Sequence, residues 1–185
     1  NMKKQTSAEA SVPTILVVFG ATGDLMKKKI IPAVYHLAQN KKIGPLFHIV
    51  GMARKYISTK DFQKDVVEHL HERITELDKQ NAKQVSQKFS YIQGDFSDTN
   101  SYIRLKSALK EIDDTWGVCT NKLFYLAVPP DHFKDIFTHM AHVGLNTPCG
   151  GDLGWTRVLI EKPFGQNTAT AKKLFALLKK FFVDE

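Results

Sequence analysis

A glycine-rich turn near the start of this chain has the residue types of a phosphate-binding loop. Gly20 and Gly23 enclose Ala21 and Thr22, directly after the apolar run 15–19. Glycine permits a tight turn and lets backbone N–H groups approach a pyrophosphate without a Cβ in the way. A helix that begins there also directs its positive dipole end toward the anion. The third glycine of the usual G-x-G-x-x-G pattern is missing, so a plain strand-to-helix turn is the alternative.

The second candidate is an arginine at the end of the apolar run 46–52. In dinucleotide-binding folds, a carboxylate at this place binds the ribose of NAD, whereas an arginine accommodates the 2′-phosphate of NADP. Arg54 occupies this place between Ala53 and Lys55, so neither of its neighbours is acidic. An arginine can hold a phosphate dianion with two hydrogen bonds, and the Thr22 hydroxyl can add another. The sequence therefore predicts NADP as the cofactor; a solvated arginine at a strand end is the alternative.

The third candidate is a lysine that directly follows the expected strand 157–161. Lys162 lies between Glu161 and Pro163. Its ammonium is a compact charge that can meet a phosphate or hydroxyl group of a substrate beside the nicotinamide. The proline fixes the backbone there and removes one hydrogen-bond donor. A surface Lys-Pro turn is the alternative, and three residues alone do not decide between the two.

Composition narrows the class of protein and of partner. The 185 residues include 26 Lys and Arg against 19 Asp and Glu, for a formal charge of +7. The basic residues are scattered without interleaved aromatics, which favours small anionic ligands over nucleic acid. No apolar run approaches the roughly 20 residues that span a bilayer. The two cysteines, Cys119 and Cys149, match no zinc spacing and are expected to be ordinary thiols in the cytoplasm.

The histidines do not predict a metal site. His69 and His71 are two residues apart on a predicted helix and therefore point in different directions. His139 and His142 share a helix face, but the sequence offers no nearby third ligand. We therefore expect no bound metal.

Short β-rich runs alternate with helical patterns along the chain. Strands are expected at 14–19, 46–52, 89–93, 122–128 and 157–161, and helices at 25–40, 59–81, 99–112, 131–142 and 168–182. This alternation predicts one Rossmann-like α/β domain over 14–185, doubly wound, with a mostly parallel sheet and helices on both faces. Residues 1–13 are expected to form a disordered polar tail, in which Asn1 is a remnant of an expression tag.

Four segments, in order and with appropriate separations, resemble the N-terminal domain of the glucose-6-phosphate dehydrogenases. They are Phe19–Leu25 with Lys28 and Lys29, Gly51–Arg54, Phe124–Pro130 and Arg157–Gly165. The resemblance covers Thr14 to the C-terminus. It implies the NADP-binding domain of an enzyme of the pentose phosphate pathway, which oxidises glucose 6-phosphate at C1 to 6-phosphogluconolactone.

The resemblance also implies site residues. Those for the cofactor are Gly20, Ala21, Thr22, Gly23, Asp24, Leu25, Met26, Lys27, Arg54, Asp95, Phe96, Ala127, Val128, Pro129 and Lys162. Lys162 is also implied to contact the sugar-phosphate substrate. Some members carry a tyrosine near the position of Phe133, and phenylalanine excludes that hydroxyl contact here.

Other parts of the family pattern do not occur in these 185 residues. The substrate segment R-I-D-H-Y-L-G-K is missing, as is the later histidine that removes the C1 hydroxyl proton. No catalytic base is therefore assigned, and the second, substrate and dimerisation domain is expected to be absent. The resemblance implies a homodimeric or tetrameric parent. We expect this chain to be a monomer that binds NADP with little turnover.

Two alternatives remain open from the sequence. The glucose–fructose oxidoreductase type also joins a Rossmann domain to a strand that ends in Glu-Lys-Pro, but it usually has a fuller glycine motif. A non-catalytic NADP-sensing module is the other alternative, because such a module needs no base.

Overall fold

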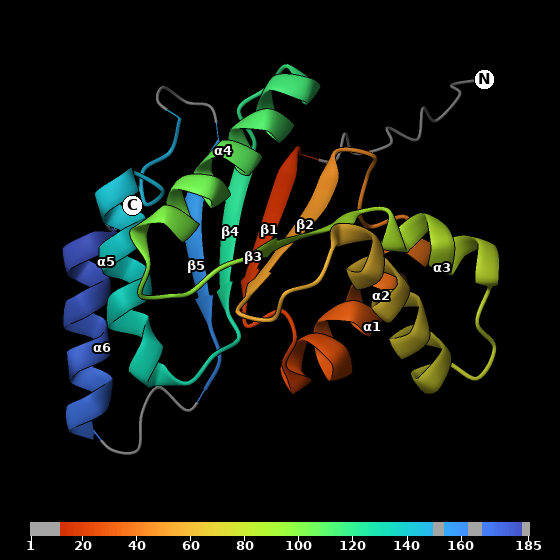
Figure 1. Cartoon of the computed structure of the whole chain (residues 1–185), viewed down its shortest axis with the longest axis horizontal. Helices are drawn as coiled ribbons and strands as arrows, with labels where there is room; N and C mark the ends of the chain where they lie inside the picture. Colours follow the sequence, from red (N-terminus) through yellow and green to blue (C-terminus); the bar gives the residue numbers. More distant parts are fainter. Residues whose placement is uncertain (1–11, 150–153, 163–167, 183–185) are drawn as a thin grey trace, which may run out of the picture.

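The described residues of the computed structural model, 12–149, 154–162 and 168–182, contain one parallel sheet in the order β3-β2-β1-β4-β5 (Figure 1). Its strands are β1 (Thr14–Phe19), β2 (Phe47–Ala53), β3 (Phe89–Gln93), β4 (Asn121–Leu126) and β5 (Thr156–Ile160). Every neighbouring pair is parallel. The predicted Rossmann-like α/β fold is therefore confirmed, with strand ends within about two residues of those expected.

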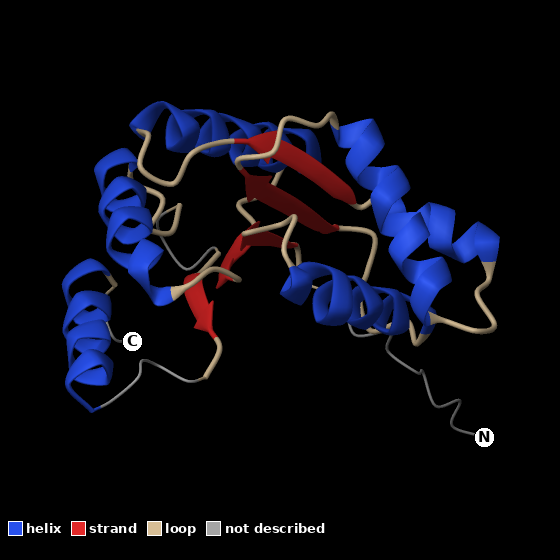
Figure 2. Cartoon of the chain, turned by 60° about the horizontal axis from the view of Figure 1, so that its bottom comes forward, coloured by secondary structure: helices blue, strands red, loops and turns tan. Residues whose placement is uncertain are grey.

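Helices cover both faces of the sheet, as Figures 1 and 2 show. One face carries α1 (Ile31–Gln39), α2 (Thr59–Arg73) and α3 (Lys79–Ser86), and the other carries α4 (Thr99–Trp116) and α5 (Phe133–Val143). The last helix, α6 (Thr168–Phe181), packs beside α5. The alternation of strand side chains produces this arrangement, because successive residues of a strand face opposite sides of a sheet.

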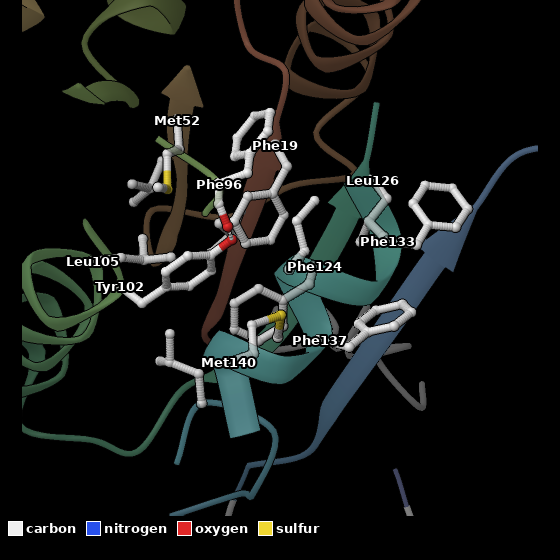
Figure 3. Close-up of a cluster of buried hydrophobic side chains, with 14 of the residues drawn as sticks. Phe19, Met52, Phe96, Tyr102, Leu105, Phe124, Leu126, Phe133, Phe137 and Met140 are labelled. Atoms are coloured by element: carbon white, nitrogen blue, oxygen red, sulfur yellow. Dashed lines mark hydrogen bonds between the residues drawn. The ribbon is translucent and has the colours of Figure 1, made fainter. Parts of the chain in front are cut away.

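The core is accordingly divided into two clusters, one on each face. In β1, Ile15, Val17 and Phe19 face the α4–α5 side, and Val18 faces the α1–α3 side. Figure 3 shows the first cluster, in which the rings of Phe19 and Phe124 stack with their centroids 6.2 Å apart. Burial on both faces explains why the strands are nearly continuous apolar runs.

The expected helix 59–81 is wrong in its second half. Helix α2 ends at Arg73, and Ile74 has an extended backbone with φ −117° and ψ 110°. A new helix, α3, begins after Asp78, whose carboxylate accepts hydrogen bonds from the Gln80 and Asn81 amides at 2.9 and 3.1 Å. Side-chain capping of this kind favours a helix start over helix continuation.

The helix after the glycine turn is continuous but irregular. Residues Met26–Ile30 form a π-helical segment that leads into α1, and Pro32 lies in the first turn of α1. Proline has no amide hydrogen and its ring displaces the carbonyl of the preceding turn. A wider turn before the proline accommodates both effects.

The prediction of two free thiols is also wrong. Cys119 and Cys149 form a disulfide with their α-carbons 6.2 Å apart. Cys119 precedes β4 and Cys149 lies in the loop before β5, so the parallel pairing of these strands brings the two cysteines to the same edge of the sheet. Of the expected tail, residues 1–11 lie outside the described part of the chain, as does Pro163.

Candidate cofactor site

The glycine turn follows β1, the central strand, on either side of which the chain adds its later strands. From β1 the chain proceeds to β2 and β3 on one side, and it then continues from β4 to β5 on the other side. In open parallel sheets, ligands bind outside the carboxyl ends of the strands at such a switch point. The ends of β2, β1 and β4 carry Arg54, Gly20 and Ala127 respectively. The fold thus brings three predicted segments to one edge.

The backbone of the turn is fixed by the neighbouring strands. The amides of Gly20 and Ala21 both donate to the Met52 carbonyl, at 2.9 and 3.2 Å. Gly20 has φ +86°, and a Cβ there would collide with the Ala127 carbonyl. Only glycine therefore fits this position without displacing β4.

The helix that follows starts at Asp24, so the amides of its first turn have no acceptor within the helix. These amides lie at the positive end of the helix dipole, where the sequence predicts that a phosphate binds. The Asp24 carboxylate lies 2.5 Å from Lys28 Nζ, and this hydrogen bond holds its pKa below the usual range. Met26 is buried in the core, so only its backbone faces the turn.

A cavity of about 710 Å³ opens on the β4 side of the turn. Its wall includes Leu25 from the turn, the segment Ala127–Pro129 that follows β4, and Lys162 after β5. The cavity therefore brings together residues that the sequence placed in separate motifs. Phe133 also lines it, with a buried side chain. The charged groups of its lining are the Lys162 ammonium and the carboxylates of Asp131 and Glu161, and most of the other lining residues are apolar. A largely apolar wall with a few charged groups suits a flat, partly charged ring.

A smaller cavity of about 160 Å³ lies on the β2 side of the turn. Its polar lining combines cationic, hydroxyl, imidazole and carboxylate groups. They belong to Thr22, Lys27, Lys55, Asp65 and His69. Arg54, whose side chain is exposed, directly precedes Lys55. The sequence prediction assigned no role to Lys55, although its place directly after Arg54 was a signal.

Asp95 and Phe96 follow β3 at the same edge but differ in surroundings. The Asp95 carboxylate accepts hydrogen bonds from the Ser97 amide and hydroxyl, at 2.9 and 2.8 Å. These bonds lower the Asp95 pKa, and the Arg54 charge contributes further. The Phe96 side chain is buried against Phe19, with ring centroids 5.9 Å apart. Phe96 can therefore face a ligand only through its backbone.

Among the described histidines, those at 139 and 69 have other partners than a metal. His139 Nδ1 lies 3.0 Å from the Thr99 hydroxyl, and its ring stacks on Tyr102. His69 Nδ1 lies 3.3 Å from the Glu72 carboxylate.

In the part of the chain that the structure describes, no helix is long and apolar enough to cross a membrane.

Two cavities on opposite sides of the glycine turn match the shape of a dinucleotide. Such a ligand has two nucleosides joined by a pyrophosphate, and the turn would lie at the pyrophosphate. The cationic cavity at β2 suits a phosphorylated ribose, and the larger apolar cavity at β4 suits the second base.

The comparisons with known proteins point to one family. The family model described as "Glucose-6-phosphate dehydrogenase, NAD binding domain" matches residues 17–185. Glucose-6-phosphate 1-dehydrogenase 2 of Mycobacterium tuberculosis is 37% identical over 174 residues, which is 94% of this chain and 34% of that protein. Glucose-6-phosphate 1-dehydrogenase of Bacillus subtilis is 32% identical over 171 residues, 92% of this chain and 33% of that protein. The chain thus spans about a third of the length of these relatives.

Solved structures give the same result. A glucose-6-phosphate dehydrogenase in complex with its substrate glucose 6-phosphate superposes with a TM-score of 0.81 and 29% identity, over 94% of this chain and 35% of that one. Glucose-6-phosphate 1-dehydrogenase from Mycobacterium avium gives 0.77 and 27%, over 94% and 34%. These matches favour the predicted family over the glucose–fructose oxidoreductase alternative. The chain belongs to the glucose-6-phosphate dehydrogenase family, in which it corresponds to the N-terminal, nicotinamide-dinucleotide-binding domain.

Proposed function

We propose that this chain binds NADP and serves as the cofactor half of a glucose-6-phosphate 1-dehydrogenase. The observation that carries the choice of NADP is the group of cations beside the glycine turn, which come from the end of β2 and from the helix that follows the turn. Lys27 and Lys55 line the smaller cavity with the Thr22 hydroxyl, and Arg54 directly precedes Lys55 in the chain. Asp65 of α2 is the opposing charge in that lining. The excess of cations over carboxylates supports recognition of a 2′-phosphate.

The two halves of the cofactor have different requirements. In this proposal the adenosine half lies over β2, with its 2′-phosphate at Arg54, Lys55 and Thr22. The pyrophosphate meets the amides that follow Gly23, where the helix dipole favours negative charge. The nicotinamide half enters the cavity at Ala127–Pro129, whose apolar wall excludes water from one face of the ring.

The proposed reaction divides its tasks between this chain and the rest of the enzyme. NADP⁺ supplies the hydride acceptor when bound. Lys162 lies in the wall of the larger cavity and can donate hydrogen bonds to a substrate hydroxyl or phosphate there. The proton of the C1 hydroxyl must leave as the hydride does, and the general base for it is proposed to lie outside these 185 residues. Binding without appreciable turnover is the consequence.

Calorimetric titration with NADP⁺ and NAD⁺ tests the proposal. NADP⁺ is expected to bind at least ~10-fold more tightly, the equivalent of one charge-assisted hydrogen bond. Tighter binding of NAD⁺, or binding of neither, would contradict it. Glucose 6-phosphate and NADP⁺ together should give no NADPH absorbance with this chain, whereas the complete gene product should be active. An inactive complete product that still binds NADP⁺ would instead support the sensing module.

A further inference from the structure

Glu161, at the end of β5, is bound from two other elements. The Tyr125 hydroxyl of β4 donates to Glu161 Oε1 at 2.5 Å, and Lys29 Nζ lies 3.2 Å from Glu161 Oε2. Both carboxylate oxygens therefore have a partner. Lys29 belongs to the π-helical segment that follows the glycine turn, so Glu161 joins that segment to the ends of β4 and β5.

The register of the sheet explains the Tyr125 contact. Tyr125 pairs with Leu159 in the parallel ladder of β4 and β5. Side chains two residues apart on a strand share a face, which places Glu161 on the same face as Tyr125. The Tyr125 side chain is only 8% exposed and belongs to the α1–α3 core cluster. Its hydroxyl is thus held in place by packing before it meets the carboxylate.

The two contacts differ in strength. The Lys29 and Glu161 side chains are 65% and 40% exposed, and exposed ion pairs contribute little because water screens them. The bond from the buried Tyr125 is the stronger one. It lowers the Glu161 pKa, with help from Lys29, while burial and this carboxylate raise the pKa of Tyr125. At neutral pH the phenol therefore donates and the carboxylate accepts.

The residue after Glu161 is Lys162, and both line the larger cavity with Ala127 and Val128. One peptide unit separates the α-carbon of Glu161, whose carboxylate is held, from the α-carbon of Lys162. We propose that Glu161 is a positioning residue: Tyr125 and Lys29 hold it, and it fixes the end of β5 so that Lys162 faces the nicotinamide half of bound NADP. This proposal rests on the proposed function, because it requires the nicotinamide in that cavity.

Comparing the affinities for two ligands shows whether Glu161 positions Lys162 or only supports the fold in general. Adenosine 2′,5′-bisphosphate carries the adenosine half of NADP without the nicotinamide. For Tyr125→Phe and Glu161→Ala, the affinity for NADP⁺ should fall about 5- to 10-fold, the size of one ordinary hydrogen bond, because the effect reaches the ligand only through Lys162. The affinity for the bisphosphate should change less than about twofold. Glu161→Gln keeps an acceptor for Tyr125 and should lose less. Tyr35→Phe, another buried tyrosine of the same cluster, is the matched control and should leave both affinities unchanged.

Calorimetry gives both affinities, and thermal unfolding shows whether each variant is folded. Equal losses for the two ligands, or unchanged NADP⁺ binding, would overturn the positioning role. The positioning role would also be overturned if the unaltered chain bound NADP⁺ no more tightly than the bisphosphate, because the nicotinamide half would then add nothing to binding. The proposed function would still stand in that case. Failure of the unaltered chain to bind either ligand would reject both proposals. If Tyr125→Phe does not fold, Glu161→Gln combined with Lys29→Met applies the same test.

Discussion

The α-carbon of Gly20 lies so close to the Ala127 backbone that a β-carbon would overlap the Ala127 carbonyl oxygen and lie 2.8 Å from Val128 Cγ1. This contact joins the glycine turn to the wall of the larger cavity. Any side chain at position 20 must therefore move either the turn or the end of β4.

Gly20→Ala should destabilise the fold and weaken cofactor binding together. The cost combines the left-handed backbone with the collision at Ala127, roughly 2–4 kcal/mol in the free energy of unfolding. Gly117→Ala is the matched control: Gly117 has φ +65°, and a Cβ there would meet nothing within 4 Å. It should cost only about 1 kcal/mol. Urea denaturation measures both, and equal costs would show that the contact with Ala127 is unimportant.

Reduction of the disulfide should destabilise the domain. Cys119 and Cys149 are 30 residues apart, and closing a loop of that length stabilises a fold by about 3–4 kcal/mol in the chain-entropy model. Denaturant unfolding with and without a dithiol reductant measures the difference. A variant with both cysteines replaced by serine should be insensitive to the reductant. Identical midpoints for the oxidised and reduced parent chain would contradict the expectation.

Stability should fall when the pH is lowered below neutrality, because of His48. Burial, with a smaller contribution from the Lys88 charge, lowers the pKa of His48 to about 4. Between pH 4 and pH 6.5 the unfolded chain binds more protons than the folded chain. The contribution of His48 to the free energy of unfolding is therefore complete above this window and is lost as the pH falls through it. The loss is up to about 3 kcal/mol.

The control for this effect is His48→Gln, which keeps a polar partner for the Ser90 hydroxyl, 2.9 Å away in the parent chain. This variant should lack the His48 part of the acid loss in denaturant unfolding. NMR titration of the imidazole gives the pKa directly. A folded-state pKa near 6.5 would contradict a half-buried histidine that stays neutral.

Lys55 is expected to add to NADP affinity as a second cation. Lys55→Ala should weaken NADP⁺ binding by about threefold, less than loss of an arginine, because an ammonium is a single point charge without a bidentate fork. NAD⁺ affinity should not change. Lys60→Ala on the outside of α2 provides the control for net charge. An equal effect of the two lysine variants in calorimetry would mean that Lys55 acts only through long-range electrostatics.

The sequence predicted the sheet and the strand-to-helix turn because both follow from local patterns. The cavity residues Ala127–Pro129 followed only from the family resemblance. Apolar runs such as 14–19 are typical of buried parallel strands, and the glycines mark the turn directly. What it missed depends on contacts between distant residues. The pairing of Cys119 with Cys149 and the bond of Tyr125 to Glu161 both require the register of β4 and β5. The break after α2 was different: Asp78 was a visible capping residue, but the helical periodicity around it hid the signal.

The most direct test of NADP selection is the titration of Arg54→Ala with both cofactors. Removal of the guanidinium should weaken NADP⁺ binding by ~10- to 100-fold, as expected for a lost hydrogen bond to a charged group, and should leave NAD⁺ affinity nearly unchanged. The difference between the two cofactors should therefore largely disappear. An equal loss for NADP⁺ and NAD⁺ would contradict the role of Arg54 at the 2′-phosphate.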